Sequence, residues 1–117
     1  MGRARDAWEQ LSAALEKQDV DTIRDLYTVD AIYLEPQNPP HEGDLLIQAY
    51  LNSWLQAREG VDIATKRLLE SADGLTLAVE WSLSYFAGGR RWSNIPRASW
   101  FDLSEQESAF RYHRDYY

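Results

Sequence analysis

A strand-like segment with a turn signal at each end occupies residues 72–89, which read ADGLTLAVEWSLSYFAGG. Asp73-Gly74 and Gly88-Gly89 are dipeptides typical of tight hairpin turns. Between them, Leu75–Phe86 largely alternates apolar residues with polar or small ones, as a strand with one buried face does. The segment therefore predicts one strand with an antiparallel neighbour on each side.

The segments on both sides of this strand support the same arrangement. Val61–Glu70 and Arg91–Leu103 have strand character, and the polar connection Ser104–Glu107 has the length of a hairpin loop before a last strand at Ser108–Tyr117. Pro96 falls inside one of these strands and suggests an edge or a bulge, because proline cannot donate to a sheet ladder. The second half of the chain is thus predicted to be an antiparallel meander.

The first half of the chain has helical spacing instead. Apolar residues recur at helical intervals in Ala4–Gln18, and Asp19-Val20-Asp21 ends that helix and offers an N-cap for a short second one. Ala31–Leu34 is predicted to be a brief strand that stops at Glu35-Pro36, and Asp44 is expected to cap a third helix. Helices followed by a meander predict an α+β domain in which the helices cover one face of a curved sheet.

Composition excludes several classes of protein. The 117 residues fit a single domain over positions 1–117. The net charge of −7 and the scattered Lys and Arg residues argue against nucleic-acid binding, because an acidic surface repels phosphate. No stretch approaches the roughly 18 apolar residues of a membrane span and the start lacks a signal-peptide run, so no membrane contact and a cytoplasmic location are expected. The absence of Cys excludes disulfides, and the presence of only two His excludes a His-rich metal site.

The last residues, Arg111–Tyr117, contain side chains that can do chemistry. On a strand, Arg111, His113, Asp115 and Tyr117 would share one face. A row made of a cation, an imidazole, a carboxylate and a phenol supports acid–base chemistry if it faces a cavity, and is an ordinary polar edge if it faces water. The residues alone leave both possibilities open.

Several short segments, in this order along the chain, carry a resemblance to a known family. They are Ala13-Ala14-Leu15, Asp19-Val20-Asp21, Leu26-Tyr27, Asp30–Pro36, Gly43 with the helix after it, Val79-Glu80-Trp81, Trp100–Leu103 and Arg114–Tyr117. With them the chain resembles the SnoaL-like branch of the nuclear-transport-factor-2-like superfamily, which includes ketosteroid isomerase and limonene epoxide hydrolase. The resemblance implies a cone-shaped α+β fold with a pocket for a small hydrophobic or amphipathic molecule, and no cofactor. Function varies widely on this fold.

The resemblance to ketosteroid isomerase implies a carboxylate general base at Glu35. The two oxyanion-hole donors of that enzyme are a Tyr and a protonated Asp, and their positions correspond to Leu11 and Arg97. The base is thus kept while both donors are lost, which argues against steroid isomerisation.

The resemblance to limonene epoxide hydrolase implies a different set of residues. That enzyme uses an Asp-Arg-Asp constellation helped by a Tyr and an Asn. One Asp is kept as Asp115 and the Tyr as Tyr33, whereas Glu35 stands at the Asn position. The alignment places the central Arg and the second Asp at Glu80 and Ser82, so this constellation is incomplete as well.

Each candidate residue also has a purely structural explanation. SnoaL-type cyclases use an Asp and a His, to which the pair of Asp115 and His113 is loosely similar, but the sequence favours a solvent-facing His113. Asp115 and Glu35 are pocket carboxylates or ordinary polar residues at strand ends. Arg97 holds a substrate anion or belongs to a buried ion pair, and the ion pair is slightly favoured. His41, in a proline-rich loop, is expected to be exposed.

The orientation of the second strand of the meander is ambiguous. Simple alternation turns Val79, Trp81 and Leu83 toward the core and Glu80 toward water. The family orientation reverses this and is the one we adopt, so that Glu80 and Ser82 would face the pocket. The Val79/Trp81/Leu83 row would then form an exposed apolar surface, which predicts a homodimer through that sheet face.

Two hypotheses about function follow. The first is a small-molecule enzyme with a partly apolar pocket and cofactor-free acid–base chemistry of the isomerase, cyclase or epoxide-hydrolase type. The second is a non-catalytic member of the same fold that binds a small ligand or only mediates association. Tyr33 and Trp54 would line the pocket, although core packing also explains them. The residues assigned to the enzyme are Glu35 and Asp115 as acid or base, with Arg97, Tyr33 and His113 orienting the substrate or stabilising negative charge.

Overall fold

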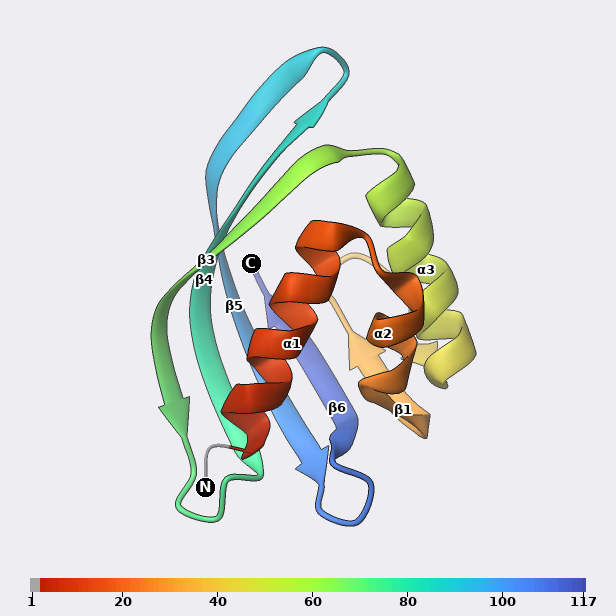
Figure 1. The fold of residues 1–117 in the computed structure, drawn as a ribbon, viewed down its shortest axis with the longest axis vertical. Helices are drawn as coiled ribbons and strands as arrows, with labels where there is room; N and C mark the ends of the chain where they lie inside the picture. Colours follow the sequence, from red (N-terminus) through yellow and green to blue (C-terminus); the bar gives the residue numbers. More distant parts are fainter. Residues whose placement is uncertain (1–2) are drawn as a thin grey trace.

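The computed structural model describes residues 3–117 of the chain. Helices and one short strand pair come first, followed by four long strands (Figure 1). The predicted order of elements is confirmed, and β2 is an addition to it. The elements are α1 (Arg3–Lys17), α2 (Val20–Asp25), β1 (Tyr27–Leu34), β2 (His41–Glu42), α3 (Asp44–Gln56), β3 (Glu59–Glu70), β4 (Thr76–Ala87), β5 (Arg90–Ser104) and β6 (Ala109–Tyr116).

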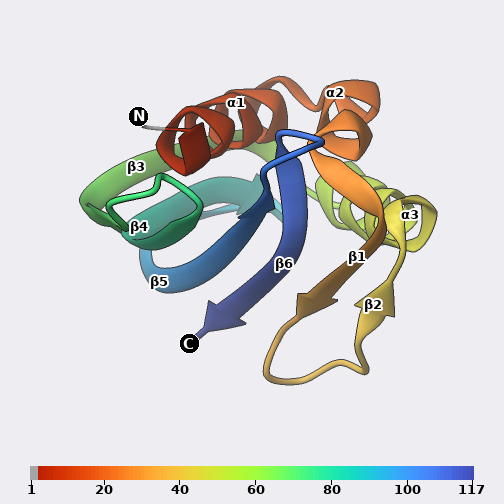
Figure 2. The ribbon, with the colours of Figure 1, turned by 90° about the horizontal axis from the view of Figure 1, so that it is seen from below.

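The strands form one sheet in the order β2-β1-β6-β5-β4-β3. Neighbouring strands are antiparallel except β1 and β6, which run parallel. The sheet bends into an arc, and α1 lies across its concave side with α2 and α3 next to it (Figure 2). This is the expected α+β cone. Within residues 3–117, no helix is both long and apolar enough to cross a membrane.

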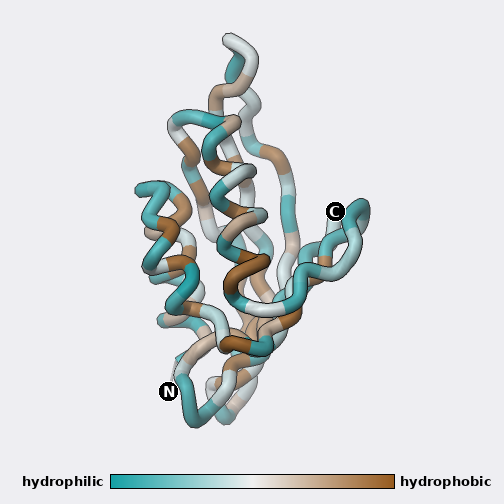
Figure 3. The backbone as a smooth tube through the Cα atoms, turned by 90° about the vertical axis from the view of Figure 1, so that its right-hand side faces the viewer, coloured by the Kyte–Doolittle hydropathy of each residue, from teal (hydrophilic) through white to brown (hydrophobic). Residues whose placement is uncertain are grey.

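Helix α1 covers the concave face of the sheet because one side of the helix is apolar. Figure 3 shows hydrophobic and hydrophilic segments alternating along the helices, as amphipathic helices require. Trp8 joins the two layers, since its indole N–H donates a hydrogen bond to the Thr65 hydroxyl of β3 (2.9 Å). The buried residues of α1 are Ala4, Ala7, Trp8, Leu11 and Ala14.

The two later helices begin differently from one another. Asp19 caps α2 as predicted, and its side chain accepts a hydrogen bond from the backbone N–H of Thr22 (3.2 Å). The predicted cap at Asp44 is wrong, because the N-cap of α3 is Gly43 with φ of +93°. Asp44 is the first helical residue, and its carboxylate pairs with Arg24 of α2 (3.4 Å).

Pro96 lies where β5 has a partner on one side only, as predicted. It is opposite Ser82 of β4, whereas the pairing of β5 with β6 begins at Ala98. The absence of a backbone N–H at Pro96 therefore costs no hydrogen bond to β6.

Strand β4 faces the other way from the orientation that the family resemblance implied. Val79 and Leu83 are buried in the core, and Trp81 packs against the same core. Glu80 is exposed and pairs with Arg67 on the outer face (3.2 Å). The prediction that the Val79/Trp81/Leu83 row forms an outer dimer face is therefore wrong. Simple alternation is right, because the helices cover the concave face and the large apolar side chains of β4 lie beneath them.

Candidate active site in the cone

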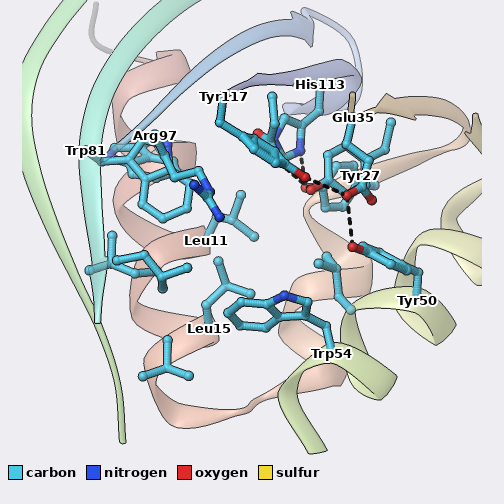
Figure 4. Close-up of a pocket in the computed structure, with 17 residues that line it drawn as sticks. Leu11, Leu15, Tyr27, Glu35, Tyr50, Trp54, Trp81, Arg97, His113 and Tyr117 are labelled. Atoms are coloured by element: carbon cyan, nitrogen blue, oxygen red, sulfur yellow. Dashed lines mark hydrogen bonds and ion pairs between the residues drawn. The ribbon is translucent and has the colours of Figure 1, made fainter. Parts of the chain in front are cut away.

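A cavity of about 80 Å³ lies between the helices and the concave face of the sheet. Leu11 and Leu15 of α1 and the indole of Trp54 form apolar walls (Figure 4). The carboxylates of Glu35 and Asp115 line the same cavity. Its volume is well below the roughly 300–1,000 Å³ of pockets for drug-sized ligands, so it fits a compact molecule.

Asp115, on β6, is buried and is surrounded by hydrogen-bond donors. Its Oδ2 atom accepts from the Tyr33 hydroxyl (2.5 Å), and its Oδ1 atom accepts from the Ser99 hydroxyl (2.6 Å) and pairs with Nε2 of His113 (2.7 Å). Burial is the largest influence and would raise the pKa of Asp115. The charge of His113 and the three hydrogen bonds together outweigh burial and lower this pKa. Asp115 is therefore an anion at neutral pH.

His113 lies inside the cone, so the solvent-facing position favoured from the sequence is wrong. Strand β6 turns His113 and Asp115 toward the concave face, while Arg111 is exposed. The imidazole stacks on the Tyr33 ring with 4.1 Å between centroids, and its Nδ1 atom lies 2.8 Å from the Tyr27 hydroxyl. Nε2–H donates to Asp115, and whenever Nδ1 carries no proton it accepts a hydrogen bond from the Tyr27 hydroxyl, which keeps its proton. Carboxylate, imidazole and phenol thus form one hydrogen-bonded chain.

Tyr27 and Tyr33 are neutral phenols in this environment. Burial raises the pKa of both hydroxyls well above the usual value, and the negative charge of Asp115 raises it further. Both residues therefore act as hydrogen-bond donors at neutral pH.

Glu35, directly after β1, is held by a second group of donors. Its Oε1 atom accepts from the hydroxyls of Tyr50 (2.9 Å) and Tyr117 (3.1 Å) (Figure 4). Its Oε2 atom lies 2.9 Å from Nε2 of His41. Burial raises the pKa of Tyr50 and of Tyr117, and the neighbouring Glu35 raises both further. Both phenols therefore remain protonated and donate to the carboxylate.

His41 is partly buried, so the prediction that it is exposed is wrong. Only 16% of its side chain is accessible, and its ring stacks on Tyr50 with 4.2 Å between centroids. The reason is the short pairing of β2 with β1, which puts His41 opposite Tyr33. Sequence reasoning treated residues 37–43 as a loop and missed this pairing. One signal in the sequence could have indicated the pairing: a histidine follows the strand-end residue Glu35 after a proline-rich turn.

Arg97 points into the cavity from β5 (Figure 4). Its guanidinium lies over the Tyr117 ring, 4.0 Å from the centroid, and its Nη1 atom donates to the carbonyl of Pro96 (3.1 Å). Among residues 3–117, Arg97 forms no ion pair with any carboxylate. The prediction of a buried ion pair at Arg97, which the sequence slightly favoured, is therefore wrong.

Glu80 and Ser82 do not line the cavity, so this part of the predicted site is also wrong. Both residues line a second groove, which the cavity residues Trp81, Arg97 and Tyr117 also border. The side chain opposite Asp115 on the neighbouring strand is Ser99, and Arg97 is two residues before it on β5.

A curved sheet covered by helices, with a largely apolar cavity that two carboxylates line, defines the chain as a pocket protein of the cone-shaped α+β class. The chain belongs to the SnoaL-like domain family, whose sequence model matches residues 8–111. This confirms the resemblance found in the sequence. A search of curated proteins gives no match.

Solved structures of three other proteins show the same fold. An epoxide hydrolase from Mycobacterium tuberculosis, similar to limonene epoxide hydrolase, is 23% identical, with a TM-score of 0.80 over 97% of this chain and 81% of its own. The epoxide hydrolase/cyclase-like enzyme SalBIII of salinomycin pyran-ring formation is 21% identical, with a TM-score of 0.82 over 97% and 88%. A Catenulispora acidiphila protein with a ketosteroid isomerase-like fold, in complex with trimethylamine, is 15% identical, with a TM-score of 0.82 over 95% and 84%. At these identities the likeness concerns the fold.

Proposed function

We propose that the chain is a small-molecule enzyme that uses its own side chains for acid–base chemistry, of the isomerase, cyclase or epoxide-hydrolase type. The observation that carries the proposal is that Glu35, Asp115 and Arg97 line one cavity whose remaining walls are largely apolar. Each carboxylate contacts a histidine, Glu35 through His41 and Asp115 through His113. Two of the proteins with the same fold, the Mycobacterium tuberculosis epoxide hydrolase and the epoxide hydrolase/cyclase-like enzyme SalBIII, are named for this class of chemistry.

The two carboxylates have different roles in this proposal. The pKa of Asp115 is lowered, which makes its carboxylate a weak base at neutral pH. Asp115 therefore fixes the positions of His113 and Tyr33 and balances a positive charge on the imidazole when it forms.

Glu35 is the residue that we assign to proton transfer with the substrate. Its carboxylate lines the cavity, whereas His41 lies behind it and reaches solvent with part of its ring. Glu35 takes a proton from a substrate and returns it to the product, while Nε2–H of His41 donates to the Oε2 atom of the carboxylate. Tyr50 and Tyr117 keep the carboxylate oriented toward the cavity.

The test is turnover of compact ketones and epoxides, both neutral and carboxylate-bearing, such as butanone, butylene oxide, 2-oxobutanoate and glycidate. Proton NMR in D2O follows exchange of the hydrogens next to a carbonyl and the opening of an epoxide. The wild-type chain should accelerate at least one of these reactions, and Glu35→Gln should reduce the rate by about 100-fold or more, the lower end of what a positioned general base contributes.

The matched control is Glu80→Gln, which removes a carboxylate from the outer face of β4 and should leave the rate unchanged. If no compound reacts, or if Glu35→Gln is as active as the wild type, the proposed function is contradicted.

We further propose that the chain forms a homodimer through the outer face of the sheet. Trp100 of β5, Tyr116 of β6 and Leu69 of β3 are exposed there and line one groove of about 520 Å³. Large apolar side chains gathered on one face are typical of protein interfaces. The predicted partner, a second copy, is thus retained, while the row Val79/Trp81/Leu83 is replaced by these outward-facing residues.

A further inference from the structure

We infer that the cavity takes an anionic substrate, a compact carboxylate, whose negative group is held by Arg97. This inference rests on the proposed function, because it uses the same cavity as the substrate site. It goes beyond that function by fixing the charge of the substrate and the end of the cavity at which the charge lies. Three steps lead to it, and each concerns the distribution of charge around the cavity.

The two carboxylates that line the cavity are already saturated with donors. Asp115 contacts Tyr33, Ser99 and His113, and Glu35 contacts Tyr50, Tyr117 and His41. An ionised carboxylate surrounded by three donors has most of its charge compensated. A cationic ligand would therefore have to break hydrogen bonds of the protein to reach either group.

Arg97 is in the opposite situation. It is half-buried, and its polar contact is one backbone carbonyl, that of Pro96 (3.1 Å). Within the described residues it has no anionic partner, and the Tyr117 ring covers one face of the guanidinium. A guanidinium carries five N–H donors in a planar fork that matches a carboxylate. Arg97 is thus the charged group of the cavity that has neither an ion-pair partner nor a full set of hydrogen bonds in the described residues.

Tyr117 fixes the distance between the anion site and the proton-transfer site. Its ring contacts Arg97, and its hydroxyl donates to Glu35. One phenol ring therefore separates the two groups, and a molecule of that length can place its carboxylate on Arg97 and a reacting carbon beside Glu35. Leu11 and Leu15 offer an apolar wall for the rest of such a molecule (Figure 4). The cavity of about 80 Å³ restricts the body to a few carbon atoms.

The experiment compares three ligands that share a tert-butyl group and differ in charge: pivalate, pivalamide and tert-butylammonium. Calorimetric titration of the wild-type chain should show that pivalate binds at least about tenfold more tightly than either of the others, as a charge-assisted hydrogen bond predicts. Arg97→Gln should abolish the preference for pivalate, and Arg97→Lys should keep part of it. Arg67→Gln, which removes a cation of the outer face, should leave all three affinities unchanged.

The outcomes separate this inference from the proposed function. Equal or tighter binding of tert-butylammonium, or no binding of pivalate, would overturn the inference even if the ketone and epoxide assay shows activity. Trimethylammonium is a fourth ligand, because a protein of the same fold is in complex with trimethylamine, and tighter binding of this cation than of pivalate would overturn the inference too. Because the ligand series is measured on the wild-type chain, the test holds even if a variant at Arg97 fails to fold. Glu35→Gln should still bind pivalate, whatever its effect on turnover.

Discussion

At the scale of single residues, Asp115 is a stabilising anion because three donors compensate for its burial. Losing one of these hydrogen bonds to a charged group costs about 1.5–3 kcal/mol. The pKa of Asp115 is lowered in the folded chain relative to the ordinary carboxyl value. The contribution of Asp115 to the free energy of unfolding is therefore fully present above the unfolded-state pKa of about 3.9. That contribution is lost as the pH falls through the lower pKa of the folded state.

Asp115→Asn tests this linkage. At pH 7 we expect the variant to have a free energy of unfolding lower by about 1.5–3 kcal/mol, because Asn accepts with one oxygen and carries no charge. The difference between wild type and variant should shrink as the pH falls below about 4, because the carboxylate of the unfolded wild-type chain takes up a proton there while that of the folded chain is still ionised. Urea unfolding at several pH values measures it. Asp62→Asn, at an exposed position, should show no such difference, and a constant difference across pH would contradict the linkage.

The residues of the site were predictable to different degrees. Asp115 and Glu35 could be named from resemblance because each stands in a segment with a recognisable order of residues, and Arg97 because it stands at the position of an oxyanion-hole donor of ketosteroid isomerase. Ser99 and His41 could not, because their importance depends on strand register. Ser99 matters only because it lies opposite Asp115, and His41 only because β2 folds back on β1. Register between distant strands is set by packing and turns that a single sequence does not display.

At the scale of elements, the start of α3 controls the position of two cavity residues. Helix α3 carries Tyr50, which donates to Glu35, and Trp54, which forms a wall of the cavity. Its N-cap, Gly43, has φ of +93° and ψ of 150°, a conformation almost restricted to glycine. A Cβ atom there would also lie 3.3 Å from the Val29 carbonyl oxygen. The direction of α3 therefore depends on a residue without a side chain.

Gly43→Ala should lower the free energy of unfolding by about 1–3 kcal/mol, the cost of a non-glycine residue in a strained backbone region. Gly89→Ala is the matched control, because it also has positive φ but lies at a hairpin tip with no heavy atom within 4 Å of the added Cβ. Thermal unfolding measures both variants. Gly43→Ala should be the less stable of the two, and equal stability would show that the contact with Val29 is harmless.

The orientation of β4 could be predicted from the residues of that strand alone. The alternation of Val79, Trp81 and Leu83 with Glu80 was enough to place the apolar row in the core, and the structure agrees with it. The orientation implied by the family resemblance gave the wrong face, since Glu80 is exposed on the outer side. For a half-buried antiparallel strand, the periodicity of the side chains was the better guide.

At the scale of the whole molecule, the two faces of the sheet differ in what covers them. The concave face lies under the helices and contributes Trp81, His113 and Arg97 to the cavity. The convex face has no helix over it within residues 3–117, and Trp100 and Tyr116 are exposed there. The sequence predicted a dimer through the Val79/Trp81/Leu83 row, which the structure places in the core. The outward-facing residues that we propose instead follow once the orientation of β4 is known.

The homodimer through the outer face predicts that one charge on this face will separate the copies. A twofold interface presents the same patch from both copies, so Trp100→Glu places two carboxylates in one apolar interface and should give a monomer.

Trp92→Glu is the matched control on the β4–β5 hairpin, because Trp92 is 39% exposed and Trp100 is 42% exposed. Sedimentation at micromolar concentration should show a dimer for the wild type and for Trp92→Glu, and a monomer for Trp100→Glu. A monomeric wild type, or a dimer that survives Trp100→Glu, would exclude this face as the interface. Because the cavity is on the opposite side of the sheet, the monomeric variant should still bind pivalate.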